Sequence, residues 1–329
     1  MKTSVKIGGF VVGLAAALTL SYGVGNAVGP VGTAADTSGG HDMSAMTSGQ
    51  TSSSSGSSVE IPGGLMVSEN GYTLQLDQPV LTAGTATTVS FRIVGPDGNP
   101  VTQYVTNHDK DLHFIAVRQD TTGFQHVHPT IDASGTWTTQ LDLTAGDWRF
   151  FADFQAAGTD EGLTLGVDAA VGGNYDPQPL PAESRTAQVD GYTVTLAGDL
   201  VAGTSSQLTL NVAKDGQPVT DLQPYLGAYG HLVALRTGDL AYLHVHPAGE
   251  PGDGVTQPGP DITFYATVPS VGTYRLYLDF QVGGQVRTAE FTLATTDAGA
   301  ASSAPSTVDH SGMTGMNMSP ETSGAQSHN

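Results

Sequence analysis

Six of the ten histidines lie in two copies of one pattern, H-x12-H-x-H-P. They are His113, His126 and His128 in the first copy, and His231, His244 and His246 in the second. Alternate residues of a β-strand point to the same face, so each H-x-H segment places two imidazoles side by side. Three neutral imidazoles suit Cu(II) or Zn(II), with one coordination position left for water or a carboxylate. The pattern predicts a metal site in each copy, which we favour over histidines that only hydrogen-bond across strands.

Two aspartates, Asp153 and Asp279, lie at matching positions of the segments RFFADFQ and RLYLDFQ. Each is a candidate fourth metal ligand, or an acceptor that orients a histidine ring through its second nitrogen. A simpler hypothesis, which we favour, is a structural Arg–Asp pair. Arg149 shares a strand face with Asp153, and Arg118 is a further candidate partner.

The two ends of the chain carry a different set of candidate ligands. Of the seven methionines, five lie in Ser/Gly-rich sequence beside histidine and aspartate. The candidate ligands are His41, Met43 and Met46 near the start, and His310, Met313, Met316 and Met318 near the end. Thioether sulfur is a soft ligand that selects Cu(I), and methionine in such sequence has no core to fill. We therefore predict Cu(I) binding there, the alternative being chance use of methionine in low-complexity sequence.

The histidine pattern belongs to a longer repeat with a period near 118 residues, the size of a small domain. We expect one domain over residues 59–173 and a second over residues 185–295, joined by a Pro-rich linker at 174–184. Residues 33–58 and 296–329 are rich in Ser, Thr and Gly, and this composition predicts disorder.

Both domains read as strands separated by Gly, Pro and Asp turns. In the first, the predicted strands are residues 72–76, 87–94, 113–118, 136–141 and 148–155. Roughly seven short strands in each domain predict an all-β protein with two tandem immunoglobulin-like β-sandwiches. Trp148 and Tyr274, each just before or at the start of a strong strand, are candidates for the aromatic corner of such folds.

An apolar face in each domain predicts a core large enough to fold without metal. The expected core residues are Leu74, Phe91, Ile115, Val127, Leu141, Phe150 and Phe154 in the first domain, and Leu208, Leu210, Val233, Val245, Leu276, Leu278 and Phe280 in the second.

The first 32 residues predict export. Lys2 and Lys6 precede a mostly apolar stretch at 7–28, followed by small residues where a signal peptidase could cut. The stretch is also long enough to cross a bilayer. The domains are therefore expected in the cell envelope or outside the cell, either anchored by residues 7–28 or secreted after cleavage. Only an uncleaved segment would attach the protein to a membrane.

Composition excludes several classes of site. The chain has no cysteine, which excludes disulfides, zinc–thiolate sites and blue-copper sites. Acidic residues outnumber basic ones 31 to 11, and the formal charge of −20 argues against nucleic acid as a partner.

Two parts of the sequence resemble exported bacterial proteins that handle metals. The segment DHSGMTGMNM at 309–318 resembles the Met/His-rich runs of periplasmic copper-resistance proteins. Leu112-His113 followed by FQHVHP at 124–129 resembles the pattern of exported heavy-metal-binding proteins, and that resemblance covers most of both repeats. It implies metal binding outside the cytoplasm on a β-sandwich. The second copy has Tyr229 and Gly230 where the first has Asp111 and Leu112, so the two sites need not be equivalent.

We favour a copper chaperone, buffer or sequestering protein of the cell envelope, with metal ions as its ligands and a metal transporter or another envelope protein as a candidate partner. The first alternative is a metal-dependent enzyme with open three-histidine sites. No general base or nucleophile accompanies the histidines in both copies apart from the aspartates, so we do not expect an enzyme. The second alternative is a structural or adhesive envelope protein.

Overall fold

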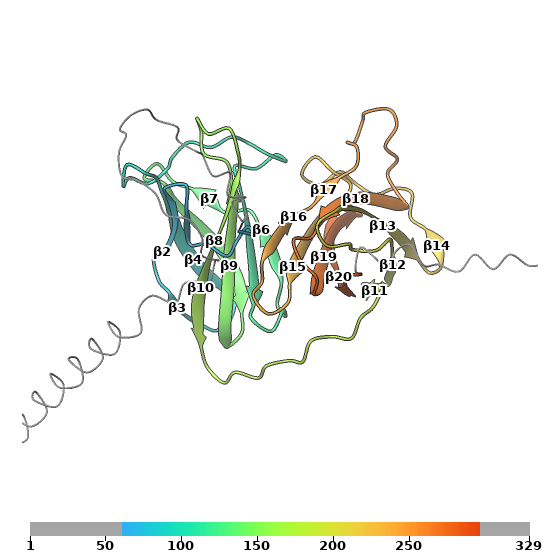
Figure 1. Ribbon diagram of the computed structural model, residues 1–329, viewed down its shortest axis with the longest axis horizontal. Helices are drawn as coiled ribbons and strands as arrows, with labels where there is room; N and C mark the ends of the chain where they lie inside the picture. Colours follow the sequence, from blue (N-terminus) through green and yellow to red (C-terminus); the bar gives the residue numbers. More distant parts are fainter. Residues whose placement is uncertain (1–60, 297–329) are drawn as a thin grey trace, which may run out of the picture. The chain divides into compact units, whose positions relative to one another are not determined.

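The computed structural model describes residues 61–296, apart from the side chains of His244 and His246 (Figure 1). The apolar segment at 7–28, the Ser/Gly-rich stretch at 33–58 and the Met/His-rich tail from residue 297 lie outside the described residues. Within residues 61–296, we find no helix with the length and hydropathy needed to span a bilayer.

The first sandwich consists of two five-stranded sheets. One sheet has the order β1 (Ser68–Glu69), β2 (Tyr72–Leu76), β4 (Gly84–Val94), β8 (Thr136–Leu143) and β7 (Thr130–Ile131). The other has the order β3 (Val80–Thr82), β10 (Leu163–Gly172), β9 (Gly146–Phe154), β5 (Leu112–Arg118) and β6 (Gln125–Val127). Neighbouring strands pair antiparallel except β3 and β10, which are parallel. The five strands predicted in this domain are all present.

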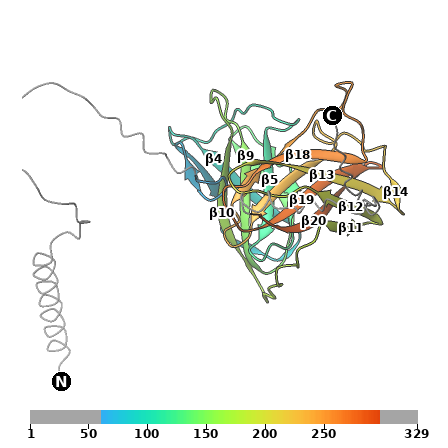
Figure 2. The ribbon, with the colours of Figure 1, turned by 45° about the vertical axis from the view of Figure 1, so that its right-hand side comes forward.

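The second sandwich follows the linker and consists of a six-stranded and a four-stranded sheet (Figures 1 and 2). One sheet has the order β11 (Thr186–Val189), β12 (Tyr192–Ala197), β13 (Ser205–Lys214), β18 (Asp261–Thr267) and β17 (His246–Pro247), with β14 (Gln217–Pro218) also paired to β13. The other has the order β16 (Tyr242–His244), β15 (His231–Arg236), β19 (Thr273–Val282) and β20 (Gln285–Ala294). The expectation of two tandem immunoglobulin-like β-sandwiches is confirmed.

Each sandwich has its own apolar core between its sheets. Most of the expected core residues are in it, and Val127 packs against it while partly exposed. Trp148 and Tyr274 are both fully buried, and each donates to the carbonyl of the residue four positions earlier. This shared contact fixes the turn before β9 and before β19.

Ile115 and Val233 were expected in these cores, and that expectation is wrong. Both belong to a third apolar cluster, which joins the two sandwiches. The cluster contains Ile115, Val117 and Phe151 of the first sandwich and Val233, Leu235, Leu240, Tyr242 and Tyr277 of the second, with Phe124 packed against it. All seven residues of β5 are buried, because one face meets the core and the other meets the second sandwich. Ile115 is an even number of positions from His113 and so shares its outer face.

Candidate metal centre

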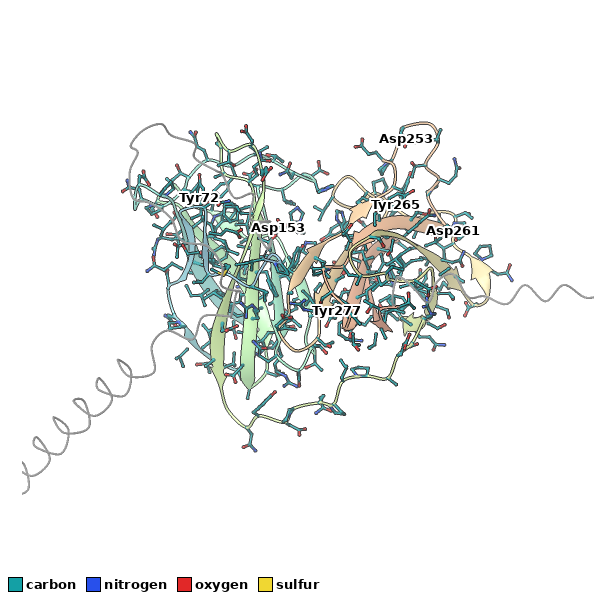
Figure 3. The ribbon with its side chains drawn as sticks, in the orientation of Figure 1. Tyr72, Asp153, Asp253, Asp261, Tyr265 and Tyr277 are labelled. Carbon is teal, nitrogen blue, oxygen red and sulfur yellow. The ribbon has the colours of Figure 1, made fainter. Side chains whose placement is uncertain are left out.

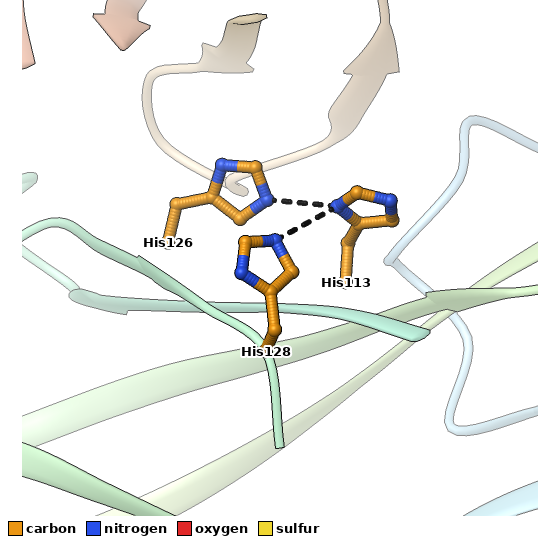
Figure 4. Close-up of side chains that lie close together, drawn as sticks. All are labelled: His113, His126 and His128. Carbon is orange, nitrogen blue, oxygen red and sulfur yellow. Dashed lines mark hydrogen bonds between the residues drawn. The ribbon is translucent and has the colours of Figure 1, made fainter. Parts of the chain in front are cut away.

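Three histidine rings of the first sandwich converge at one end of β5 and β6 (Figure 4). The register places Phe114 opposite Val127 and Ile115 opposite His126, which brings His113 close to the end of β6. The Nδ1 atom of His113 lies 3.1 Å from Nε2 of His126 and 3.3 Å from Nε2 of His128. These three side chains form a group whose ligand atoms all lie within 4.8 Å of one another.

The outward nitrogens of two of these rings have fixed acceptors. Nε2 of His113 lies 3.2 Å from the carbonyl oxygen of Asn107, and Nδ1 of His126 lies 2.9 Å from a carboxylate oxygen of Asp279. Carbonyl and carboxylate oxygens accept hydrogen bonds, so the ring hydrogens are on these outward nitrogens. When both rings are neutral, the nitrogens that face each other across 3.1 Å both carry lone pairs. His128 can offer one hydrogen, which serves only one of them.

A tight turn holds the carbonyl oxygen that orients His113. The backbone amides of Asn107 and Lys110 each donate to the other's carbonyl, and the residues between them, His108 and Asp109, have φ values of 49° and 63°. Two consecutive left-handed residues are typical of a type I′ turn. The second sandwich repeats the device at 225–228, where the carbonyl oxygen of Tyr225 accepts from Nε2 of His231 at 2.8 Å.

Burial keeps the imidazoles of His113 and His128 neutral. Burial first, and then the repulsion of a charge on His126, lowers the pKa of His113 to about 4. Burial, followed by repulsion from the neighbouring histidines His126 and His113, lowers the pKa of His128 to about 3. Both rings are therefore neutral at pH 7, and neutral imidazole is the form that binds a metal ion.

These pKa values predict how stability depends on pH. In excess chelator each sandwich is expected to stay folded at pH 7 on its own core. As the pH falls from about 6.5 toward 4, the unfolded chain takes up protons on His113, His128 and His231 that the folded chain does not. The free energy of unfolding should then drop by on the order of 3 kcal/mol per histidine at most. Urea unfolding at pH 7.0, 6.0 and 5.0 measures this, and a flat profile would contradict the assignment.

The aspartates lie beside the histidines but differ in what they contact. Asp279 comes from the second sandwich, and it accepts from Thr288 Oγ1 at 2.6 Å as well as from His126. Asp153 lies opposite His113 in the register of β5 and β9. It accepts from Thr164 Oγ1 at 3.2 Å and from the hydroxyl of Tyr242 at 3.4 Å.

The arginines have carboxylate partners that the sequence did not indicate. Arg118 forms a two-pronged pair with Asp120, at 2.9 and 2.6 Å. Arg149 donates to Asp168 and to the carbonyl oxygens of Gly64 and Leu65. These contacts make both arginines structural residues of the first sandwich.

The second histidine copy is described only in part. The ring of His231 lies 6.3 Å from that of His113 and 6.2 Å from that of His126, measured between centroids. His244 lies in β16 and His246 in β17, but their side chains are outside the described part of the chain. The tail candidates His41, Met43, Met46, His310, Met313, Met316 and Met318 also lie outside it.

Sequence reasoning missed His108, which lies close to this cluster. Its ring is 5.5 Å from that of His231 and 6.2 Å from that of His113. The repeat gave no signal, because the matching position of the second copy is Leu226. With His113 and Asp153, His108 lines a cavity of about 620 Å³, which reaches the cluster at His113.

Strand order and cores define the class of this protein as a pair of immunoglobulin-like β-sandwiches. The chain belongs to a family described as a domain of unknown function (DUF8832), whose profile matches residues 67–170 and again residues 187–297. No curated protein matches the chain.

The solved structures that match the chain do so at low identity and low TM-score. The Escherichia coli adhesin FdeC is 19% identical over 70% of this chain and 65% of that one, with a TM-score of 0.21. The Yersinia pseudotuberculosis adhesin InvE is 14% identical over 69% of this chain and 59% of that one, with a TM-score of 0.21. A titin fragment is 11% identical over 69% of this chain and 98% of that one, with a TM-score of 0.18. The match thus spans less than two thirds of either adhesin chain.

Proposed function

We propose that this chain is an exported metal-binding protein whose first sandwich binds one Cu(II) or Zn(II) ion through His113, His126 and His128. The observation that carries the proposal is the convergence of three ring nitrogens, with 3.1 and 3.3 Å between neighbours. Two nitrogens held about 2.0–2.1 Å from a tetrahedral ion lie about 3.3–3.4 Å apart. The rings are therefore close to the spacing that such an ion requires.

The contacts behind the ligands support the same proposal. Histidines that bind metals usually donate their second ring hydrogen to a carboxylate or a carbonyl, which fixes the tautomer. His113 has Asn107 in this role, and His126 has Asp279. The adjoining cavity of about 620 Å³ gives an ion a route to His113. A site with such a route suits a protein that takes up and releases its ion, as a chaperone or buffer does.

Titration of the purified chain with Zn(II) and Cu(II) by calorimetry tests the proposal. After treatment with chelator and dialysis, at least one equivalent of either ion should bind at pH 7, with no proton released from His113 or His128 because both rings are already neutral. Absence of saturable binding would refute it. A turnover assay on the loaded protein would separate a binding protein from the enzyme alternative.

Deletion of residues 300–329 should reduce the capacity for Cu(I) and leave Zn(II) binding nearly unchanged. Of the four candidate ligands in that segment, three are thioethers, whereas the described cluster is made of imidazoles. Competition with a chromogenic Cu(I) chelator measures the first quantity, and calorimetry measures the second. Equal loss of Cu(I) and Zn(II) binding would show that the thioethers of this segment and the imidazoles of the sandwich do not bind different ions.

A structural or adhesive role in the envelope is the second candidate. The observation in its favour is the apolar interface between the sandwiches, which would hold them together as a rigid spacer without any ion. On this proposal the titration would show no binding, and the melting temperature would not respond to metal.

A further inference from the structure

We infer that the metal ion couples the two sandwiches: binding at the three histidines tightens the docking of the first sandwich on the second, and docking raises the affinity for metal. This inference rests on the proposed function. It assigns the second sandwich a part in a site whose three candidate ligands all belong to the first.

The first link is the contact between His126 and Asp279. The two side chains come from different sandwiches, lie 2.9 Å apart, and are 4% and 5% exposed. The carboxylate sets which nitrogen of His126 faces the site. If the sandwiches separate, the ring loses this acceptor and becomes free to rotate or to change tautomer. The ligand set would then be organised only at His113.

The second link is that the same strands carry both the ligands and the interface. On β6 and just before it, Phe124 is two residues from His126, and on β19 Tyr277 is two residues from Asp279. Phe124 and Tyr277 stack with 4.0 Å between ring centroids and 5° between planes. The hydroxyl of Tyr277 also donates to the carbonyl oxygen of Thr121 at 2.7 Å. Figure 3 labels Tyr277 where the two sandwiches meet (Figure 3). A shift of this stack moves Asp279 relative to His126.

The third link is a second set of contacts between the sandwiches, made by the residues that match Phe124 and Tyr277 in the repeat. Tyr242, which matches Phe124, packs on Phe151 at 5.6 Å, and its hydroxyl donates to Asp153 at 3.4 Å. The backbone amide of Tyr242 donates to Gly63, in a segment that Arg149 holds on the first sandwich. The two sets of contacts together oppose sliding of the sandwiches as well as their separation. An ion that favours one docked geometry can then bias docking toward it.

Coupling of this kind is reciprocal. If docking changes the metal affinity by some factor, metal must change the docking equilibrium by the same factor. Loss of an acceptor behind a ligating histidine typically lowers metal affinity 10- to 100-fold. The linker at 174–184 keeps both sandwiches in one chain. An undocked state would therefore be measured as a local opening of the chain and not as dissociation.

The experiment uses full-length protein and Zn(II) alone. Asp279→Asn removes the charge behind His126, and Tyr277→Ala removes the stacking partner of Phe124 without touching a candidate ligand. Both should weaken Zn(II) binding by roughly 10-fold or more. Tyr192→Ala is the matched control, because Tyr192 is a buried tyrosine of the same sandwich that packs in its core against Phe280. It should destabilise the second sandwich and leave Zn(II) affinity within about 3-fold of wild type.

Hydrogen–deuterium exchange gives a second readout that does not depend on measuring affinity. Zn(II) should slow exchange in residues 231–243 of the wild-type second sandwich as well as in 113–127, and the effect on 231–243 should be lost in Asp279→Asn. Wild-type affinity in both interface variants, or Zn(II) protection confined to the first sandwich, would overturn the inference and leave the proposed function standing. If wild type binds no Zn(II), the proposed function fails, and this inference fails with it.

Discussion

Replacing His126 and His128 together with alanine is expected to abolish the Zn(II) or Cu(II) equivalent bound by the first sandwich. The change removes two of the three converging nitrogens, and His113 alone cannot hold an ion at the affinity of a three-imidazole site. Calorimetry should show the stoichiometry falling by one. An unchanged stoichiometry would mean that the ion binds elsewhere in the chain.

The matched control for that experiment is His108→Ala. His108 is a neighbouring histidine whose ring centroid lies 6.2 Å from that of His113, and it is outside the converging group. Its removal should keep the stoichiometry and change the affinity less than about 3-fold. A loss equal to that of the double variant would show that proximity to the cavity, rather than the three-ring geometry, determines binding.

Among the variants proposed, Phe114→Ala should lose the most stability. Its free energy of unfolding of the first sandwich should fall by about 3–5 kcal/mol. Phe114 is fully buried and stacks on Phe91, which belongs to the facing sheet, with 4.5 Å between ring centroids. Phe114 also follows His113 directly on β5. If the change unfolds the sandwich, the three histidines no longer converge, and metal binding should be lost. Urea unfolding followed by circular dichroism measures the effect.

Val80→Ala is the control for Phe114→Ala, because Val80 is an apolar residue of the same sandwich that is 68% exposed. Its free energy of unfolding should stay within about 0.5 kcal/mol of wild type. Equal losses from the two variants would contradict the placement of Phe114 between the two sheets.

The strands and the convergence of the histidines could be predicted because both follow from period two. In the first copy, alternation puts His126 of β6 and His128, just past its end, on one face, and the strand pairing brings in His113. The same rule shows that Ile115 shares that face, but it does not show what covers the face. The error over Ile115 and Val233 came from assuming one buried face per strand, where both faces are buried.

The sequence offered Asp279 as an acceptor behind a histidine ring, but which ring it contacts depends on tertiary placement and could not be predicted. Nothing local to His126 indicates that its acceptor is Asp279, 153 positions along the chain. The carbonyl oxygen of Asn107 has no side-chain signature at all. Only the turn that presents it could have been sought, and its two left-handed positions hold histidine and aspartate instead of the usual glycine.

The interface joins matching faces of two copies of one repeat. Ile115, Val117 and Phe151 of the first sandwich occupy the same repeat positions as Val233, Leu235 and Tyr277 of the second. A first sandwich therefore presents a surface that fits the second sandwich of any copy of the chain. Two chains that exchange sandwiches keep every contact of the interface and differ from two monomers only in the path of the linkers and the entropy of joining. During synthesis the first sandwich is complete before the second emerges. At high expression, neighbouring chains can therefore exchange sandwiches. The linker at 174–184 opposes this exchange, because it keeps the second sandwich of the same chain at high local concentration.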